Sequence, residues 1–403
     1  MLGTTDQTLF GNLTVAGTVT SLCSKVPTDP FGDLRTVQRV SVLDIKSTFG
    51  LSTLRDVSAV VGTGAVTGTV GTPEIALTVA AASDSATLQT AERGCFVSGF
   101  GVEAGIAVRL SSATLSGNQR ARWGYYDGVD GAFFQLSSTG LALGVSRASV
   151  ETIVSQSAWN VDKLDGTGPS GLTLDVTRGA VFQVVLSCGY GAVAWRVALP
   201  NAVGAQVVQT LHTFYPSGAT SIATPHLPVY AALANLGTAG SNTMYVAGRA
   251  VSVIGPVPVP TKRLTTAYAL NVTLSKASGF LPILSVSRKT GYVGNPMRVA
   301  SVDFIAGNGC AYELRAGSTL TGASYGPFPD TVATETAMQL DTTATAGSGG
   351  VVIYAGIVAA GATTVRLDDL PYSIEGLAVT LFVYCFGGNS ASLSCAARFS
   401  EEW

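Results

Sequence analysis

The sequence has little charge, and none of that charge is clustered. Charged side chains make up 12% of the 403 residues, against about a quarter in an average soluble domain. The formal net charge is −2, and no basic cluster exceeds a pair such as Lys262-Arg263. A nucleic-acid-binding protein needs a basic patch to meet the phosphates. Nucleic acid is therefore not an expected partner.

A long apolar run is also missing. No segment approaches the roughly 18 to 20 consecutive apolar residues of a membrane-spanning helix, although mean hydropathy is +0.38. The start of the chain, M-L-G-T-T-D, contains neither a basic nor an apolar signal region, so no secretory signal is expected. An apolar chain without a membrane span indicates either an unusually large core or an exterior that other subunits cover.

Histidine and paired cysteine are scarce. The two histidines, His212 and His226, are too few for a proton relay or a His-rich metal cage, and His212 is expected to be a hydrogen-bonded residue of a strand. No C-x-x-C pair occurs, which favours buried thiols in a reducing compartment over disulfides or a metal site. The cysteines are Cys23, Cys95, Cys188, Cys310, Cys385 and Cys395, of which only the last two are close in sequence.

Short β-prone runs dominate residues 40–254, with Gly, Ser, Asn or Asp between them. In the run 193–199, Val193, Trp195 and Val197 alternate with Ala194 and Arg196, which predicts a strand with one buried face. Residues 181–186 are apolar on both faces except Gln183, which places that strand centrally. Residues 40–49 are the one segment that could form a helix. The pattern predicts an all-β fold, with a jelly-roll-like β-sandwich over residues 40–254.

The composition changes at residues 255–263, where the sequence G-P-V-P-V-P-T-K-R predicts a stiff Pro-rich linker. Beyond it, residues 264–403 predict a second, smaller β-sandwich, with strands near 297–304, 311–315, 351–359, 377–386 and 393–399. Residues 1–39 are expected to form an N-terminal arm, with a short strand pair at 11–20. Whether this arm grips neighbours or is a frayed terminus stays open.

A turn-rich stretch divides the first predicted sandwich. Residues 159–175 read W-N-V-D-K-L-D-G-T-G-P-S-G-L-T-L-D, and the stacked Gly and Pro residues leave no room for a helix or an unbroken strand. We expect an architectural loop on the rim of a sheet, continuing into a strand at 172–175.

Two glycine motifs suggest chemistry that their context disfavours. Gly166-x-Gly168-x-x-Gly171 fits a dinucleotide fingerprint, but that motif needs a strand followed by a helix, and Pro169 interrupts it. Gly322-x-Ser324-x-Gly326 fits the nucleophile elbow of hydrolases, which in that fold requires a later histidine. Both histidines precede Ser324, so a turn serine is favoured.

The acidic residues also have a structural explanation, as caps of turns. Asp162, Asp165 and Asp175, or Asp127 and Asp130, could bind a hard cation, but Asp-Gly is above all a turn dipeptide, and turn caps are favoured. A glycan hydrolase would need paired carboxylates. Asp303 and Glu375 are unsupported candidates for such a pair. We therefore predict no enzyme, and no catalytic, cofactor-binding or metal-binding residue.

Three strings between residues 31 and 175 carry a resemblance. Residues 31–35, F-G-D-L-R, followed by V-S-V-L-D-I-K at 40–46, are similar to the opening of a widespread virion-protein domain. Gly117-Asn118-Gln119 with R-W-G-Y-Y-D at 122–127 resembles its central segment, and residues 159–175 match its most recognisable string. Gly189-Tyr190-Gly191, His212 and Leu227-Pro228 fall where the pattern has further members. The family comprises structural proteins of tailed phages and of large double-stranded DNA viruses.

The C-terminal part resembles a β-domain that is appended to structural proteins of the same viruses. The similarity is carried by P-I-L-S-V-S-R-K at 282–289, L-T-G-A-S at 320–324, D-T-T-A-T-A-G-S-G-G at 341–350 and the ending F-S-E-E-W. The resemblance implies a capsid protein of the virion, assembled in the host cytoplasm. The first choice is a penton that forms fivefold vertices as a homopentamer, with neighbouring major and minor capsid proteins as partners and no cofactor.

Two other roles remain open within this class. A minor capsid or decoration protein, or a fibre protein, could bind a receptor or host-surface glycan through its C-terminal domain. Tyr325, Phe328 and Trp403 could then stack on sugars, although packing is the favoured role for these aromatic residues. Fibres are usually trimeric and vertices pentameric, so the mass of the oligomer separates the alternatives.

Overall fold

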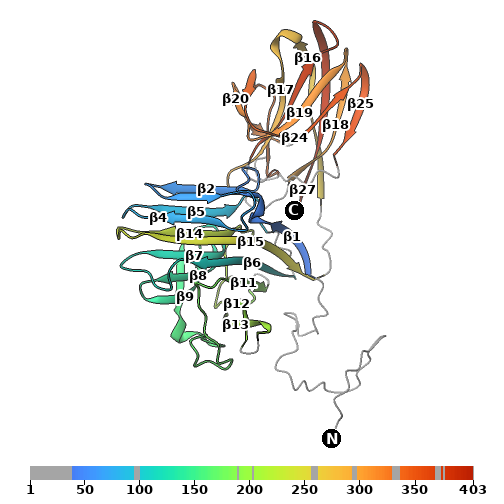
Figure 1. Ribbon diagram of the computed structural model, residues 1–403. Helices are drawn as coiled ribbons and strands as arrows, with labels where there is room; N and C mark the ends of the chain where they lie inside the picture. Colours follow the sequence, from blue (N-terminus) through green and yellow to red (C-terminus); the bar gives the residue numbers. More distant parts are fainter. Residues whose placement is uncertain are drawn as a thin grey trace, which may run out of the picture. The chain divides into compact units, whose positions relative to one another are not determined.

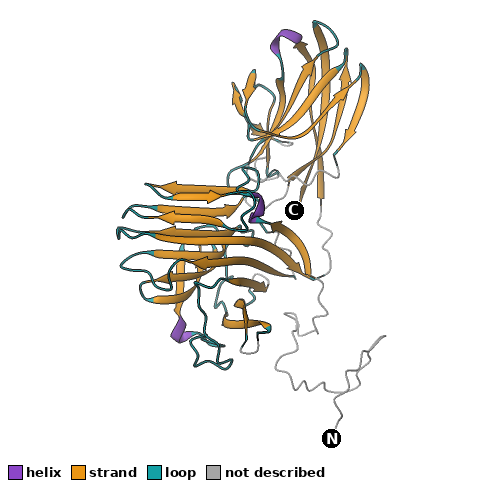
Figure 2. Ribbon diagram, viewed as in Figure 1, coloured by secondary structure: helices purple, strands orange, loops and turns teal. Residues whose placement is uncertain are grey.

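The computed structural model is nearly all β. It describes residues 39–94, 100–187, 190–201, 204–255, 262–292, 297–328, 336–367, 374 and 377–402. The predicted arm, apart from Arg39, and most of the predicted linker lie outside these residues. Three short 3-10 turns are the helical elements of the described part of the chain (Figure 2). No helix found there is long and apolar enough to cross a membrane.

The first sandwich is jelly-roll-like, and it appears in blue to yellow in Figure 1. Every strand pair in it is antiparallel, and successive strands pass repeatedly from one sheet to the other. The eight-stranded sheet has the order β13 (Gln206–Phe214), β12 (Val193–Pro200), β11 (Ala180–Ser187), β6 (Gly101–Leu110), β15 (Asn242–Ile254), β4 (Ile75–Val79) and β3 (Ala65–Gly68), with β1 (Arg39–Ile45) also paired to β15. The seven-stranded sheet has the order β10 (Val150–Ser155), β9 (Gly140–Arg147), β8 (Gly131–Ser137), β7 (Arg120–Tyr126), β14 (Val229–Ala234), β5 (Ser85–Thr90) and β2 (Asp56–Val61).

Alternation along the strands builds the first core. On β12 the side chains of Val193, Trp195 and Val197 are buried, as their spacing predicts. The Trp195 indole N–H donates to the backbone oxygen of Phe133 on the opposite sheet, at 3.2 Å. The rings of Trp123 and Phe182 also meet between the sheets, 5.0 Å apart. Aromatic side chains therefore hold the two layers together.

Two local predictions for the first sandwich are wrong. Residues 40–49 contain strand β1 and the 3-10 turn η1 (Ser47–Phe49), because β1 pairs with β15 and buries Leu43 and Ile45. Residues 172–175 form no continuous strand, since only an isolated bridge joins Thr173 to Asp165. In both places tertiary pairing, rather than local preference, decides the conformation.

The second sandwich is smaller and is drawn in orange and red in Figure 1. Its core includes Val302, Phe304, Leu381, Leu393 and Phe399. One sheet has the order β16 (Lys262–Ser275), β27 (Ser390–Glu402), β18 (Met297–Ala306) and β25 (Gly361–Arg366), so Lys262 and Arg263 belong to a strand and not to the predicted linker. The other has the order β21 (Gly326–Pro327), β22 (Met338–Asp341), β17 (Leu281–Arg288), β26 (Val379–Cys385), β19 (Cys310–Ala316) and β24 (Val351–Val358), and β20 (Thr319–Thr321) pairs separately with β23 (Ala346–Ser348).

Three of the six cysteines lie in the second core. Cys310, Cys385 and Cys395 are buried free thiols, as predicted. Cys310 lies directly opposite Cys385 on the neighbouring strand. Burial raises the pKa of the Cys310 thiol and that of Cys395 to about 11, so both are protonated and unreactive at neutral pH. Cys23, Cys95 and Cys188 lie outside the described residues.

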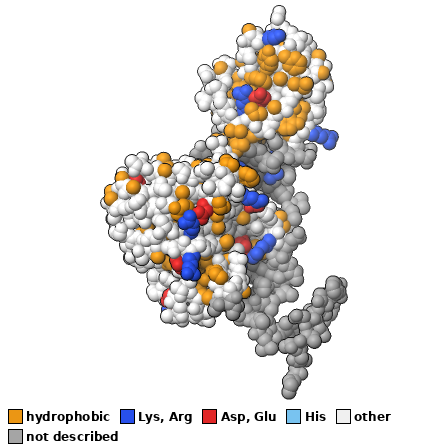
Figure 3. Space-filling view, in the orientation of Figure 1, with side chains coloured by type: hydrophobic (Ala, Val, Ile, Leu, Met, Phe, Trp, Pro, Cys, Tyr) orange, Lys and Arg blue, Asp and Glu red, His pale blue; other side chains and the backbone are white. Residues whose placement is uncertain are grey.

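Exposed hydrophobic side chains gather at the sheet edges. More than half of the large ones lie on strands that have a partner on one side only. The surface otherwise carries few charged groups, as Figure 3 shows on one face. The exposed edge residues are Val57, Val60 and Val61 on β2, Val150 and Ile153 on β10, Val208 on β13, Leu264, Tyr268 and Leu270 on β16, and Val351, Val352, Tyr354 and Ile357 on β24.

Candidate functional site

The loop at residues 159–175 is held to its own sandwich by hydrogen bonds. The buried Trp159 ring donates to the Val154 carbonyl at 3.3 Å. The Asn160 side chain exchanges two hydrogen bonds with the backbone of Thr213 on β13, both 2.9 Å. His212 lies in β13, and its Nδ1 accepts from the Asn160 backbone N–H at 3.1 Å. Burial lowers the pKa of His212, which favours the neutral imidazole that can accept this bond.

The acidic residues of this loop serve its own turns. Asp162 accepts hydrogen bonds from the backbone N–H groups of Leu164, at 2.9 Å, and Ser170, at 2.8 Å. Gly168 passes so close that a Cβ would lie 2.2 Å from Asp162 Oδ1. Asp165 accepts from the Thr167 hydroxyl, at 2.6 Å, and from its backbone N–H, which lower the pKa of Asp165. No helix follows the glycine motif in this loop, so the helix N-terminus that would bind pyrophosphate is missing here.

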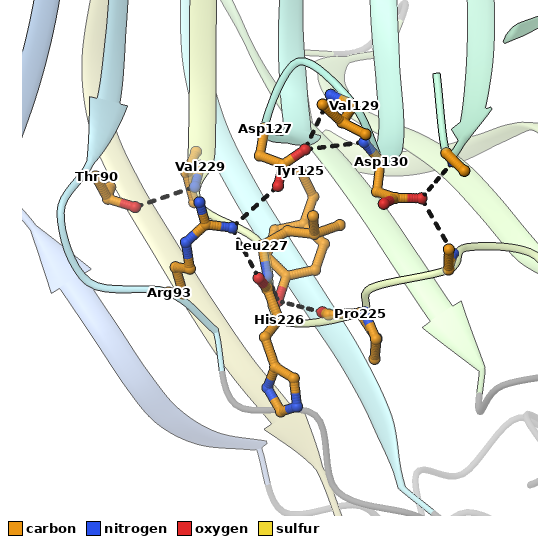
Figure 4. A network of polar contacts seen from close by, with 12 residues as sticks. Thr90, Arg93, Tyr125, Asp127, Val129, Asp130, Pro225, His226, Leu227 and Val229 are labelled. Carbon is orange, nitrogen blue, oxygen red and sulfur yellow. Dashed lines mark hydrogen bonds and ion pairs between the residues drawn. The ribbon is translucent and has the colours of Figure 1, made fainter. Parts of the chain in front are cut away.

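The turn between β7 and β8 is a second closed network (Figure 4). Asp127 caps it by accepting from the backbone N–H groups of Val129 and Asp130, and its other oxygen meets Arg93 at 3.1 Å. Asp130 accepts from the backbone of Ala148 and Ala223. These carboxylates therefore join three separate chain segments. Within the described ranges, no three His, Cys, Asp or Glu side chains gather as a metal site would require.

The candidates in the second sandwich are scattered. Ser324 precedes the two-residue strand β21, and its backbone N–H donates to Asp341 at 2.8 Å. Tyr325 shares a hydrogen bond with Ser285 at 2.8 Å, and Phe328 is buried with its ring 6.2 Å from that of Phe399. Asp303 accepts from the Thr364 hydroxyl at 2.7 Å. Glu375 and Trp403 lie outside the described residues.

The outer face of the seven-stranded sheet brings polar and aromatic side chains together. Arg122 on β7 clasps Glu151 on β10 through two hydrogen bonds of 2.6 and 2.7 Å. Arg122 also donates from Nε to Gln135 at 2.9 Å, so all parts of its guanidinium are engaged. The pairing with Arg122 lowers the pKa of Glu151. We call this group, together with the residues described next, the sheet-face cluster.

The side chain of Arg122 reaches Glu151 across the outer face of this sheet. Strands β7 and β10 are separated by β8 and β9, which puts them roughly 14 Å apart across a flat sheet. Arg122 spans the gap above Phe133, with its guanidinium 4.3 Å from the ring centroid. Phe133 lies flat against Gly144, where a Cβ would be 2.3 Å from the ring. A side chain at residue 144 would therefore displace Phe133 and its neighbours.

Two tyrosines extend the cluster. Tyr126 packs against Phe133, with ring centroids 4.8 Å apart, and against Tyr230 on β14, with centroids 5.2 Å apart. The Tyr126 hydroxyl donates to the Gly128 carbonyl at 2.8 Å. Burial raises the pKa values of both tyrosines. Aromatic rings beside fixed polar groups are a usual arrangement for binding ligands with one apolar and one polar face.

Arg120 completes the sheet-face cluster and differs from Arg122. It lies two residues earlier on β7, on the same outer face, and is half-buried. Within the described part of the chain, no hydrogen bond or ion pair holds its guanidinium. Burial, and then the charge of Arg122, lowers the pKa of Arg120. Two cations therefore share one carboxylate, Glu151.

A second polar group lies on the outer face of the eight-stranded sheet. Arg109 on β6 forms two hydrogen bonds of 2.7 Å with Glu74, and its guanidinium lies 3.5 Å from the ring centroid of Tyr245. These residues line an open hollow of about 460 Å³ together with Arg178 and Gln206. Here the charge of Arg109 is matched, and the face of Tyr245 is covered.

The sheet-face cluster was missed at the level of sequence. Arg122 and Tyr126 enter the sequence-based expectations only through the resemblance carried by residues 122–127, and Arg120, Glu151 and Tyr230 are not predicted as site residues. A signal did exist, because R-A-R-W-G-Y-Y alternates polar and apolar residues along β7, so that Ala121, Trp123 and Tyr125 face the core. Glu151 lies on another strand, and its meeting with Arg122 follows from the sheet.

Comparisons with known proteins identify no family for this chain. No protein-family model matches the sequence, and no curated protein does. Among solved structures, a peanut lectin is similar over 55% of this chain and 100% of its own, at 11% identity and a TM-score of 0.33. A Griffonia simplicifolia lectin matches over 52% and 99%, at 10% identity and 0.32. A botulinum neurotoxin DC binding domain in complex with SialylT matches over 52% and 47%, at 8% identity and 0.32. The match thus spans about half the length of that toxin chain.

Proposed function

We propose that this chain is a non-enzymatic surface protein of a virus particle, of the decoration or fibre kind, whose first sandwich binds carbohydrate through the sheet-face cluster. The virion assignment is supported by the motif strings at residues 117–127 and 159–175. The binding assignment is supported by one observation: the partly exposed side chains of Arg120 and Tyr230 border the buried Tyr126, Arg122 and Gln135 on the outer side of this sheet. Sugars offer both apolar faces and hydroxyl groups to such a surface.

The face of the first sandwich is a better candidate than the aromatic residues of the second. Phe328 is buried, and the Tyr325 hydroxyl is already bonded to Ser285. Tyr230 is partly buried, as Tyr325 is, but it lies within electrostatic range of the partly exposed Arg120. The binding surface is therefore proposed for the first sandwich and not for the C-terminal domain.

A glycan array probed with the purified full chain tests this function. We expect binding to a restricted set of oligosaccharides and at least a tenfold weaker signal for Tyr230→Ala. Tyr245→Ala on the other sheet is the matched control and should bind as the parent does. Absence of binding to any glycan, or equal loss in both variants, would rule out recognition by the sheet-face cluster.

A shell or vertex protein is the second candidate, favoured by the exposed edge strands. Exposed apolar side chains on β2, β10, β16 and β24 are unusual for a lone subunit, because open edges invite pairing with other chains. Copies of the chain, or neighbouring capsid proteins, would cover them. The mass of the oligomer and the copy number per particle decide: a pentamer at about sixty copies supports fivefold vertices, whereas a trimer at fewer copies supports a fibre.

The absence of catalysis is part of the proposal. The backbone N–H of Ser324 donates to Asp341, and the Asp303 carboxylate accepts from the Thr364 hydroxyl. We expect bound oligosaccharides to be recovered intact after long incubation, as mass spectrometry of the mixture would show. Release of shorter sugars would overturn this part.

A further inference from the structure

We infer that the sheet-face cluster selects acidic glycans and that Arg120 binds the anionic group, a sugar carboxylate or sulfate ester. This inference rests on the proposed carbohydrate-binding function and adds the class of ligand. Arg120 and Arg122 lie on the same face of β7, and the Glu151 carboxylate accepts two hydrogen bonds from Arg122 and none from Arg120. The cluster therefore holds two positive charges and one described carboxylate, an excess of one positive charge.

Arg120 is partly exposed. In the sheet register, Arg120 lies opposite Ala234 on β14 and Ser137 on β8, which are both small. Arg122, the next outward residue on β7, directs its own guanidinium away toward β10. The two residues directly opposite Arg120 are thus too small to cover its side chain. A planar set of N–H donors at this position suits bidentate binding of a carboxylate or sulfate.

Partial burial makes this charge more selective than an exposed arginine. An arginine stays protonated at neutral pH even where burial and a neighbouring cation lower its pKa, as they do for Arg120. A charge in partly desolvated surroundings interacts more strongly with an anion, because less solvent screens it. An incoming anion would also offset the repulsion between Arg120 and Arg122. Tyr230 lies close enough to both arginines for their charges to affect its pKa. Its ring is therefore available to a sugar whose anionic group is bound by Arg120.

The opposite sheet provides an internal comparison. On its outer face Arg109 is neutralised by Glu74 and covers the ring of Tyr245. The same residue types are present there, but no charge is left over in that trio. Selectivity for an anion is therefore expected on the seven-stranded face and not on the Arg109 face.

The test titrates the full chain with matched oligosaccharides, each in a neutral form, a form with one sugar carboxylate and a form with one sulfate ester. We expect an acidic form to bind at least tenfold more tightly than its neutral twin, and the preference to shrink as salt is raised. Arg120→Gln should abolish the preference, Arg120→Lys should keep part of it, and the control Arg109→Gln should keep all of it. Circular dichroism and thermal unfolding confirm that each variant is folded.

The outcomes separate the inference from the function on which it rests. Preference for the carboxylated form alone assigns a carboxylate ligand, and preference for the sulfated form alone assigns a sulfate. Equal binding of acidic and neutral forms, or a preference that survives Arg120→Gln, overturns the inference and leaves carbohydrate binding standing. Absence of binding by every form overturns both. A smaller oligomer in Arg120→Gln would assign the residue to a subunit contact and overturn the inference as well.

Discussion

The two outer faces of the first sandwich carry the same residue types, arginine, glutamate and tyrosine, but differ in how the charges are paired. On the eight-stranded sheet, Arg109, Glu74 and Tyr245 form a closed trio in which charge and ring are both satisfied. On the seven-stranded sheet, Arg122 and Glu151 form an equally tight pair, but Arg120 beside them forms no hydrogen bond or ion pair with any described residue. An arginine–carboxylate pair is thus not a sign of a binding site. The informative feature is the cation that remains after the pairs are made.

The buried ion pair between the two sheets should have the largest effect. Arg249 on β15 contacts Asp56 on β2 at 2.6 Å, and their side chains are 1% and 3% exposed. Asp56→Ala leaves a buried guanidinium without its counter-charge, which should lower the free energy of unfolding by about 3–5 kcal/mol. Urea denaturation measures this. A loss no greater than that of a surface pair would show that water reaches Arg249.

Removing Arg122 should come next, and should separate the two faces. Arg122→Ala deletes three hydrogen bonds and the cover over Phe133, so we expect unfolding to require about 2–3 kcal/mol less. Glycan binding should fall with it, because Arg122 positions Glu151 and the aromatic rings. Denaturation and titration of one preparation give both values. Unchanged binding would remove Arg122 from the site.

Arg109→Ala is the matched change on the other face and should cost less. Its side chain and that of Glu74 are about one-third exposed, where ion pairs contribute roughly 0–1 kcal/mol. We expect a small drop in stability and full retention of glycan binding. An effect as large as that of Arg122→Ala would mean that the two faces are equivalent and would break the comparison.

The pH dependence of the Arg122–Glu151 pair should be the smallest effect. The pKa of Glu151 is lowered in the folded chain, so its contribution is present above the ordinary glutamate pKa and is lost as pH falls through the folded value. The stability difference between the parent and Glu151→Gln should be constant from about pH 6 to 8 and shrink below about pH 4. Denaturation over this pH series measures it. A difference that grows in acid would contradict the assignment.

Much of the fold could be predicted because strand patterns are local. The alternating spacing of Val193, Trp195 and Val197 predicts a strand with one buried face. The Gly and Pro residues of the 159–175 loop predict a turn-rich connection. The segment at 40–49 was ambiguous because its pattern is short, and pairing with β15 decides that it is a strand. The candidate site could not be predicted in the same way, since its residues come from β7, β8, β10 and β14.

The sequence by itself determined which side chains leave the core, because successive residues of a strand point to opposite faces. It thereby placed Arg120, Arg122 and Tyr126 together on the outer side of β7. Only the tertiary structure decided which of them would find partners. The order of the strands brings Glu151 to Arg122 from 29 residues away, and no local pattern encodes that contact or the excess charge of Arg120.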